Sequence, residues 1–165
     1  MKKNLLLFSF LCISVMAFSQ SQRMVFVEEF TQASCPPCET TTPALNAIIE
    51  ANAEKIVQIR YQTSWPGVDP MNADNPGEVQ ARVDYYGVNG VPDVFVDGTT
   101  TGNPGTLPQT SIDNSYGTEA PFVIEVEHTI NDLSSMDVTV KITNESDMAF
   151  DDVNDKLRVA LIEEV

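Results

Sequence analysis

Hydrophobic positions in the first two thirds of the chain follow two patterns, one typical of strands and one typical of helices. Residues 24–30 form a mostly apolar run, which predicts a buried strand, and an apolar stripe at helical spacing follows at residues 44–49. The same reasoning predicts a strand at 55–61, a helix at 76–86, a strand at 91–96 and a short helix at 109–116. Strands that alternate with helices predict an α/β fold.

Two segments between these elements lack a clean period. Residues 62–75 contain Pro66 and Pro70 and are expected to form an ordered loop. Residues 99–108 are rich in threonine, glycine and proline, and are expected to form a second loop. This second segment follows Asp97 and a glycine, a pair typical of a β-hairpin turn.

The pattern changes near residue 118, where glycine and proline interrupt it. Beyond this point inward and outward positions alternate, as expected for strands with one buried face. The inward set comprises Phe122, Ile124, Val126, His128 and Ile130, then Val138, Val140 and Ile142, then Leu157, Val159 and Leu161 at the start of a third strand. Three strands are too few for the usual antiparallel β-sandwich. We therefore expect one domain at 20–118, an incomplete β-sandwich (Ig-like) domain at 119–165, and a fragment of a longer protein.

The N-terminal residues have the features of a secretory signal peptide. Two lysines precede an apolar run at residues 5–18, and positions 17 and 19 carry the small residues that a signal peptidase prefers. The run is shorter than the roughly 20 residues of a transmembrane helix. We therefore expect residues 1–19 to be a cleaved signal peptide. The mature protein is expected to be exported to the periplasm, the outer membrane or the medium.

Charge and cysteine content narrow the class of function. The sequence carries 24 acidic residues against 9 Lys and Arg, a formal net charge of −15, which argues against a nucleic-acid partner. It has no glycine-rich phosphate loop and no dinucleotide fingerprint, which argues against nucleotide binding. Without the signal peptide the cysteines are Cys35 and Cys38, and these two with the single His128 are too few ligands for zinc. We expect no metal and no cofactor.

The motif Cys35-Pro36-Pro37-Cys38 lies between a predicted buried strand and an amphipathic helix. Cys35 is expected to cap the helix, where unpaired N–H groups and the helix dipole stabilise a thiolate, and to act as an exposed nucleophile. Cys38, one turn into the helix, is then the resolving thiol and close enough for a disulfide. Pro37 disfavours the helical conformation at Pro36, so the helix is expected to begin one residue later. The alternative is a structural disulfide that only joins strand to helix.

Three further features at fixed offsets from these cysteines make the chain resemble the thioredoxin superfamily. Glu29 stands six residues before Cys35, where these proteins carry a buried acid, and Pro43 stands five residues after Cys38, where they carry a proline. Residues 86–96, Tyr-Gly-Val-Asn-Gly-Val-Pro-Asp-Val-Phe-Val, resemble the cis-proline segment of the superfamily and its following strand. The resemblance covers roughly residues 24–116.

This resemblance implies a thioredoxin-like fold, with a central mixed sheet flanked by helices. It also implies that the Val91-Pro92 bond is cis, that this segment packs against the cysteines, and that the Val91 backbone pairs with an extended partner peptide. Glu29 would be buried near Cys38 and take its proton. The alternative is that Glu28 is the buried acid, because adjacent strand residues face opposite ways and only one of them can serve.

Some positions depart from the resemblance. Ser34, Asp93 and Glu39 stand where relatives often carry a tryptophan, a threonine and a basic residue. The two acids oppose a nearby thiolate, which favours a reductase or isomerase over a strong oxidant. Residues 61–72 are longer than a minimal thioredoxin needs, and resemble the insertion of a secreted thioredoxin-like envelope family with a trailing β-domain. Trp65 there either contacts a partner or packs the loop onto the domain.

The sequence therefore predicts an exported thiol-disulfide oxidoreductase whose partners are protein thiols or disulfides of the cell envelope. Its expected site residues are Cys35 as nucleophile, Cys38 as resolving thiol, Glu29 as proton shuttle, and Val91, Pro92 and Trp65 as the docking surface. The alternative from another class is an envelope or surface binding module that uses a thioredoxin scaffold with a structural disulfide. A third interpretation is a holder of unfolded chains that uses the same groove without exchange.

Overall fold

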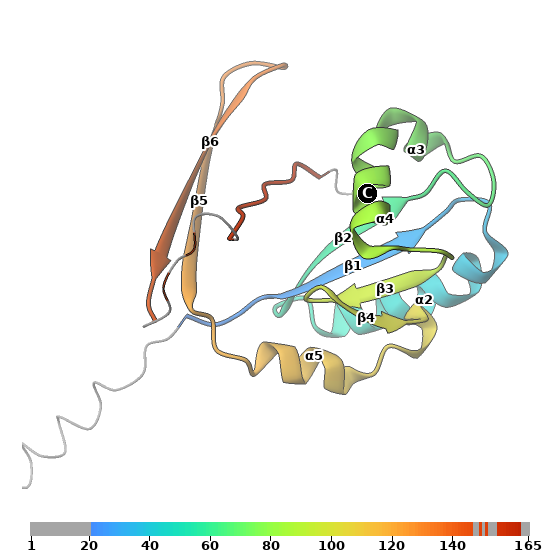
Figure 1. Cartoon of the computed structure of the whole chain (residues 1–165), viewed down its shortest axis with the longest axis horizontal. Coiled ribbons are helices and arrows are strands. Elements are labelled where there is room, and N and C mark those ends of the chain that lie inside the picture. The colour runs from blue at the N-terminus through green and yellow to red at the C-terminus, as the bar shows by residue number, and fades with distance from the viewer. Residues whose placement is uncertain (1–20, 147–148, 150, 152–154, 163–165) are drawn as a thin grey trace, which may run out of the picture. The chain divides into compact units, whose positions relative to one another are not determined.

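The computed structural model describes residues 21–146, 149, 151 and 155–162 (Figure 1). The chain divides into two compact units, Arg23–Thr118 and Glu119–Leu157, with terminal pieces assigned to each. The predicted signal peptide at 1–19 lies outside the described residues. Within the part of the chain that is described, no helix combines the length and the apolar character needed to cross a membrane.

A four-stranded sheet with the order β2-β1-β3-β4 forms the centre of the first unit (Figure 1). Its strands are β1 (Val25–Thr31), β2 (Ile56–Gln62), β3 (Asp93–Val96) and β4 (Thr99–Gly102). β1 pairs in parallel with β2 and antiparallel with β3, which in turn pairs antiparallel with β4. The mixed sheet that the resemblance to the thioredoxin superfamily implied is therefore present, with β1 as an interior strand.

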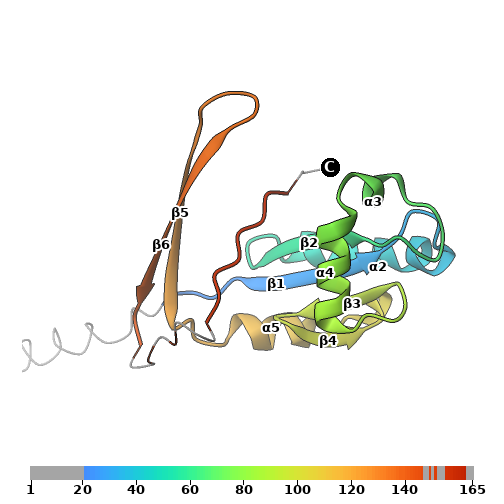
Figure 2. The same cartoon turned by 45° about the horizontal axis from the view of Figure 1, so that its top comes forward.

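Helices cover both faces of this sheet. The helices α2 (Pro36–Ala51) and α5 (Gln109–Tyr116) lie on one face and α4 (Pro76–Tyr86) lies on the other (Figure 2). Each face has its own apolar cluster. The first contains Val25, Val27, Leu45, Ile56, Val94, Val96, Leu107 and Ile112, and the second contains Phe30, Val79, Val83, Val88 and Phe95. Because side chains alternate along β1, Val27 belongs to the first cluster and Phe30 to the second.

Both segments expected to be loops contain regular structure. Residues 62–75 include the short helix α3 (Pro70–Asp74), because the Asp69 carboxylate accepts hydrogen bonds from the first N–H groups and Pro70 needs no donor there. Residues 99–108 include β4 and the 3₁₀ turn η1 (Pro104–Thr106). The turn before β4 forms because Asp97 and its following glycine both adopt positive φ, at 47° and 79°.

Helix α2 begins at Pro36, one residue earlier than expected. Cys35 is extended, with φ −94° and ψ 105°, which is the conformation that a following proline favours. Pro36 and Pro37 occupy the first turn, where a helix makes no use of the missing N–H groups. The restriction that Pro37 places on Pro36 is therefore accommodated inside the helix.

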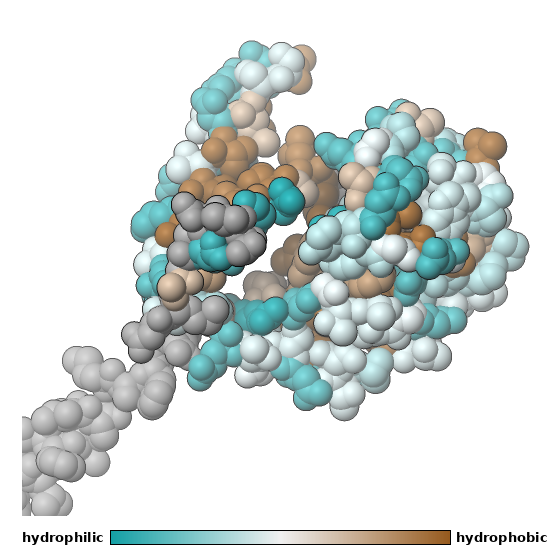
Figure 3. All heavy atoms as spheres, in the orientation of Figure 1, coloured by the Kyte–Doolittle hydropathy of each residue, from teal (hydrophilic) through white to brown (hydrophobic). Residues whose placement is uncertain are grey.

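The second unit contains a two-stranded antiparallel ribbon of β5 (Phe122–Ile130) and β6 (Met136–Asn144). The predicted inward positions face one another in the pairing: Ile124 and Ile142, Val126 and Val140, His128 and Val138. Their side chains remain largely exposed, His128 included, and brown surface gathers along the ribbon in Figure 3. Residues 155–162 have no regular structure, so the expected third strand from Leu157 is wrong. Alternation alone does not make a strand, because its backbone N–H and C=O groups need a paired neighbour.

Candidate active site

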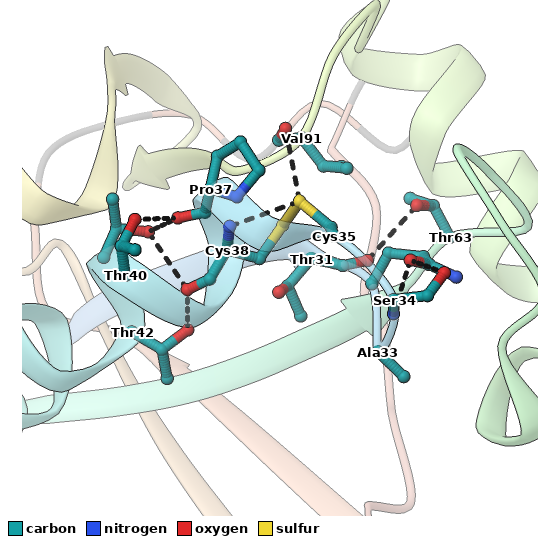
Figure 4. The surroundings of a disulfide bond; sticks show 12 residues. Thr31, Ala33, Ser34, Cys35, Pro37, Cys38, Thr40, Thr42, Thr63 and Val91 are labelled. Carbon is teal, nitrogen blue, oxygen red and sulfur yellow. Dashed lines mark hydrogen bonds between the residues drawn. A yellow bond between two sulfur atoms is a disulfide. The ribbon is translucent and has the colours of Figure 1, made fainter.

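A disulfide joins Cys35 and Cys38 at the N-terminus of α2 (Figure 4). Cys35 is the N-cap residue, and its Sγ accepts a hydrogen bond from the Cys38 N–H at 3.2 Å. The expected cap is therefore confirmed. Once the disulfide is reduced, this position leaves the Cys35 sulfur beside the Cys38 N–H and the positive end of the helix dipole, which stabilise a thiolate.

The cysteine pair is less accessible than expected. In the disulfide form Cys35 is 4% exposed and Cys38 is 2% exposed, so the expectation of an exposed nucleophile is wrong for this state. One covering group is the Val91 carbonyl, whose oxygen lies 3.7 Å from the Cys35 Sγ (Figure 4). The Val91-Pro92 bond is cis, as predicted. A Cys35 thiol would be within hydrogen-bond reach of this carbonyl after reduction.

Both acids of β1 are fully buried, which corrects the expectation that only one would be. Glu28 faces α4 and accepts hydrogen bonds from Arg82, from the Tyr61 hydroxyl and from the Tyr86 hydroxyl. Glu29 faces α2, the helix that carries the cysteines, because neighbouring strand residues point to opposite faces. Each face of β1 is covered, and each acid has its own arginine.

Glu29 is held by Arg60, its direct partner in the parallel pairing of β1 with β2. The Arg60 Nε donates to the Glu29 Oε2 at 2.6 Å, while the Glu29 Oε1 has no hydrogen-bond partner among the described residues. Burial raises the pKa of Glu29, and the charge of Arg60 and its hydrogen bond offset this only in part. The sequence analysis missed Arg60, although aligning β2 in parallel with β1 would have placed it beside Glu29.

A cleft of about 360 Å³ opens beside the disulfide. It lies between the turn that follows β1, the first turns of α2, the end of β2 and α3, and its lining includes Cys35, Cys38, Glu39, Arg60, Gln62 and Met71. Two buried amide atoms of lining residues, the Gln32 Nε2 and the Gln62 Oε1, find no hydrogen-bond partner among the described residues. The cleft therefore presents polar groups together with both cysteines and the arginine that contacts Glu29.

Trp65 lies outside the lining of this cleft and packs, partly buried, against the second apolar cluster. Val91 packs against the same cluster, so Trp65 and the docking segment share a support. The Thr63 Oγ1 donates to the Trp65 carbonyl at 2.6 Å, which fixes the loop backbone there. The structure thus places Trp65 on the domain core, and its contact with a partner stays a prediction.

Two of the departures noted in the sequence also have defined surroundings. Asp93 follows the cis-proline, and burial raises its pKa, although hydrogen bonds from the Val94 N–H and from Thr100 oppose this. Ser34 donates its N–H and its hydroxyl to the Gln32 Oε1, at 2.7 Å and 2.9 Å. Among the residues described, no group of three His, Cys, Asp or Glu side chains is placed to hold a metal ion.

No family model and no curated protein matches the chain. Among solved structures, HBP35 of Porphyromonas gingivalis is similar at 20% identity with a TM-score of 0.53, over 66% of this chain and 38% of that chain. Tryparedoxin I from Leishmania major is similar at 17% identity and a TM-score of 0.39, over 66% and 98% of the two chains. Thioredoxin from Wuchereria bancrofti is similar at 20% identity and a TM-score of 0.34, over 62% and 78%.

This chain therefore spans less than half of the Porphyromonas gingivalis structure that it matches. Identities of this size concern the fold alone. The mixed sheet, the helices on both faces and the likeness to HBP35 agree in giving the first unit a thioredoxin-like fold.

Proposed function

We propose that this protein is a thiol-disulfide oxidoreductase that exchanges disulfides with protein substrates. One arrangement carries the proposal: Cys35 caps α2, Cys38 lies one turn inside the helix, and the Val91 carbonyl faces the Cys35 Sγ at 3.7 Å. A cysteine sulfur at a helix N-terminus favours the thiolate. A backbone segment beside it offers hydrogen bonds to an extended peptide that carries the reacting disulfide.

The exchange proceeds in two steps. In the reduced protein the Cys35 thiolate attacks one sulfur of a substrate disulfide, a bond forms between these two sulfurs, and the other substrate sulfur leaves as a thiolate. The Cys38 thiolate then attacks the Cys35 Sγ, which forms the Cys35–Cys38 disulfide and releases the second substrate sulfur. Two electrons pass to the substrate, whose thiolates take up protons. The reverse sequence oxidises a substrate dithiol.

Glu29 is the proposed proton acceptor for the Cys38 thiol in the second step. Burial raises its pKa, so its carboxylate binds a proton more readily than an exposed glutamate does. Arg60 contacts Glu29 and lines the cleft together with Cys38, so one side chain links the buried acid to the cleft beside the cysteines.

A reductase or isomerase is proposed over a strong oxidant. Glu39 lies in the first turn of α2 and lines the cleft with both cysteines, so its carboxylate opposes a thiolate at Cys35. A less stable thiolate makes the disulfide less oxidising. The exposed part of Trp65 is proposed to add apolar contact to the partner, because Trp65 and Val91 pack on the same cluster. The leader-like residues 1–19 support export, and hence partners among cell-envelope proteins.

The near-burial of the disulfide supports a second candidate, a binding module in which the thioredoxin-like unit is a scaffold. In that case the Cys35–Cys38 bond stays oxidised and only joins the turn after β1 to α2. The two candidates differ in whether the disulfide is reduced reversibly at ordinary redox potentials.

The test is a redox equilibrium of the protein in glutathione buffers, read by thiol alkylation and mass spectrometry of the Cys35–Cys38 peptide. A reversible couple between about −120 and −270 mV is expected for an exchange enzyme, with the lower end for a reductant. Cys38→Ser should trap mixed disulfides with partners in an envelope extract, and Cys35→Ser is the control that should trap far fewer. A disulfide that resists reduction below about −300 mV, with nothing trapped, would favour the scaffold.

A further inference from the structure

The segment at residues 62–75, which we call the buttress loop, packs against the turn that leads into the cysteine motif, residues 31–35. At its start, the Thr63 N–H donates to the Thr31 carbonyl at 2.9 Å. In its middle, Gly67 approaches so closely that a Cβ placed there would lie 2.2 Å from the Ser34 Oγ. The two segments are therefore fitted to one another on both sides of Ala33.

Asp69 joins the two segments through its buried carboxylate, the residue being 4% exposed. Its Oδ2 accepts a hydrogen bond from the Ala33 N–H at 2.7 Å. Its Oδ1 accepts from the Met71 N–H at 2.9 Å and from the Asn72 N–H at 3.2 Å. The two oxygens have different tasks, because one caps α3 and the other holds the turn before Cys35.

The turn held by Asp69 leads into Cys35, whose extended conformation the following proline also favours. The Cys35 N–H donates to the Gln32 carbonyl at 3.2 Å, and the Gln32 Oε1 accepts the Ser34 N–H at 2.7 Å. This network leaves Cys35 extended, so that its Sγ meets the Cys38 N–H and the Val91 carbonyl. Ala33 is the one residue of the turn whose N–H is bound by the buttress loop through a charged side chain.

We propose that Asp69 is a positioning residue for the Cys35 nucleophile, acting through the Ala33 N–H rather than by contact with the reacting sulfur. The proposal deepens the oxidoreductase function and rests on it. If the turn is released, the Cys35 sulfur spends less time at the N-terminus of α2, and the thiolate loses part of its stabilisation. Loss of position therefore makes the Cys35 thiolate harder to form.

The direction in which substitution of Asp69 changes the formation of the Cys35 thiolate distinguishes a positioning role from an effect of its charge. Removing a carboxylate near a thiolate takes away repulsion, which by itself makes the thiolate easier to form. Asp69→Asn and Asp69→Ser remove the negative charge and keep an N-cap residue for α3, but neither presents a second oxygen to Ala33. If Asp69 positions Cys35, both variants therefore make the Cys35 thiolate harder to form. If only the charge of Asp69 matters, both variants make it easier to form.

The experiment follows the pH dependence of iodoacetamide alkylation at Cys35, in the Cys38→Ser background of the full chain, read by mass spectrometry of the Cys35 peptide. We expect both Asp69 variants to raise the alkylation midpoint by about half a pH unit, which is about a threefold loss of thiolate below the midpoint. Asn72→Ala is the matched control, because it removes the hydrogen bond from the Asn72 side chain to the Gln62 carbonyl in the same loop without touching residues 31–35. Its midpoint should equal that of the parent.

An unchanged midpoint in both Asp69 variants, with unfolding midpoints lowered as in Asn72→Ala, would overturn the proposal and leave Asp69 a structural residue. A lowered midpoint would overturn it in favour of charge alone. Alkylation needs no partner protein, so these outcomes are independent of whether the unmodified chain exchanges disulfides. A disulfide that is not reversibly reduced in glutathione buffers would rule out the oxidoreductase function. An alkylation midpoint that is the same in the parent and in both Asp69 variants would rule out only the role of Asp69.

Discussion

The Arg60 guanidinium lies directly across the parallel pairing from Glu29 and donates to its Oε2 at 2.6 Å, yet this carboxyl is a weaker acid than that of an exposed glutamate. Its pKa is raised because burial removes more hydration than Arg60 replaces. A raised pKa is what the proposed transfer of a proton from Cys38 to the Glu29 carboxylate requires. The pairing of β1 with β2 thus places an ion pair with a raised carboxyl pKa on the face of the sheet that α2 covers.

Stability should fall as the pH rises through the raised pKa of Glu29. The folded state favours the protonated acid, so its contribution is complete below the ordinary pKa of 4.5 and is lost above the raised value. Glu29→Gln keeps the neutral shape at every pH. We expect its free energy of unfolding, relative to the parent, to increase from pH 4 to pH 8 in urea titrations followed by circular dichroism. Parallel pH profiles for the two proteins would contradict this.

The same substitution should slow the second step of exchange. Without a carboxylate to accept the Cys38 proton, the mixed disulfide at Cys35 should persist, and its resolution should slow by about 10²-fold. Rapid quenching with acid and mass spectrometry of the mixed disulfide measure this rate. Glu28→Gln is the control on the opposite face of the same strand, and should lose stability without accumulating the mixed disulfide.

Arg82 should matter for folding rather than for exchange. It donates from its Nε to the Glu28 Oε1 at 2.7 Å and from an amino nitrogen to the Oε2 at 2.9 Å, and Glu28 is fully buried. Arg82→Met leaves this carboxylate without its cation, and should cost about 3 kcal/mol in urea unfolding. Lys55→Met removes the more exposed pair with Asp113 and should cost much less, because solvent screens that pair. Equal losses in the two variants would refute the distinction.

Trp65→Ala should affect both stability and partner exchange. Removing a partly buried indole from the second cluster should lower the free energy of unfolding by about 2 kcal/mol, below the range for fully buried tryptophans. If the exposed part of Trp65 contacts partners, exchange with a protein disulfide slows while exchange with a small aromatic disulfide does not. If Trp65→Ala changes the rate of exchange by the same factor for both substrates, the role of Trp65 is limited to packing.

Local sequence patterns predicted the elements whose formation depends mainly on residues that are close together in the sequence. The helices at 76–86 and 109–116 have the predicted bounds, and Cys35 caps α2 because of its place before two prolines. The pair of Asp97 and glycine predicted a hairpin, although the strand that follows it was expected to be a loop. Helix α3 was missed because Asp69-Pro70 marks a loop equally well until the carboxylate is seen to cap N–H groups.

Features that depend on distant residues could not be predicted in this way. Alternation along β1 shows that Glu28 and Glu29 face opposite ways, but not that both faces are covered. Burial of both acids requires Arg82 from α4 and Arg60 from β2, which lie 54 and 31 residues further along the chain. The prediction of a strand from Leu157 was wrong for the same reason, namely its dependence on distant residues. Alternation within a segment does not reveal whether another strand pairs with it.

The position of Trp65 determines what an optical unfolding experiment on this protein measures. It is the only tryptophan in the sequence, and it packs on the core of the first unit. Intrinsic fluorescence therefore reports on the thioredoxin-like unit alone, while the β5–β6 ribbon, a type of structure that is only marginally stable in isolation, contributes nothing to that emission. A fluorescence midpoint and a calorimetric midpoint for the whole chain describe different cooperative units, and they agree only if the two units unfold together.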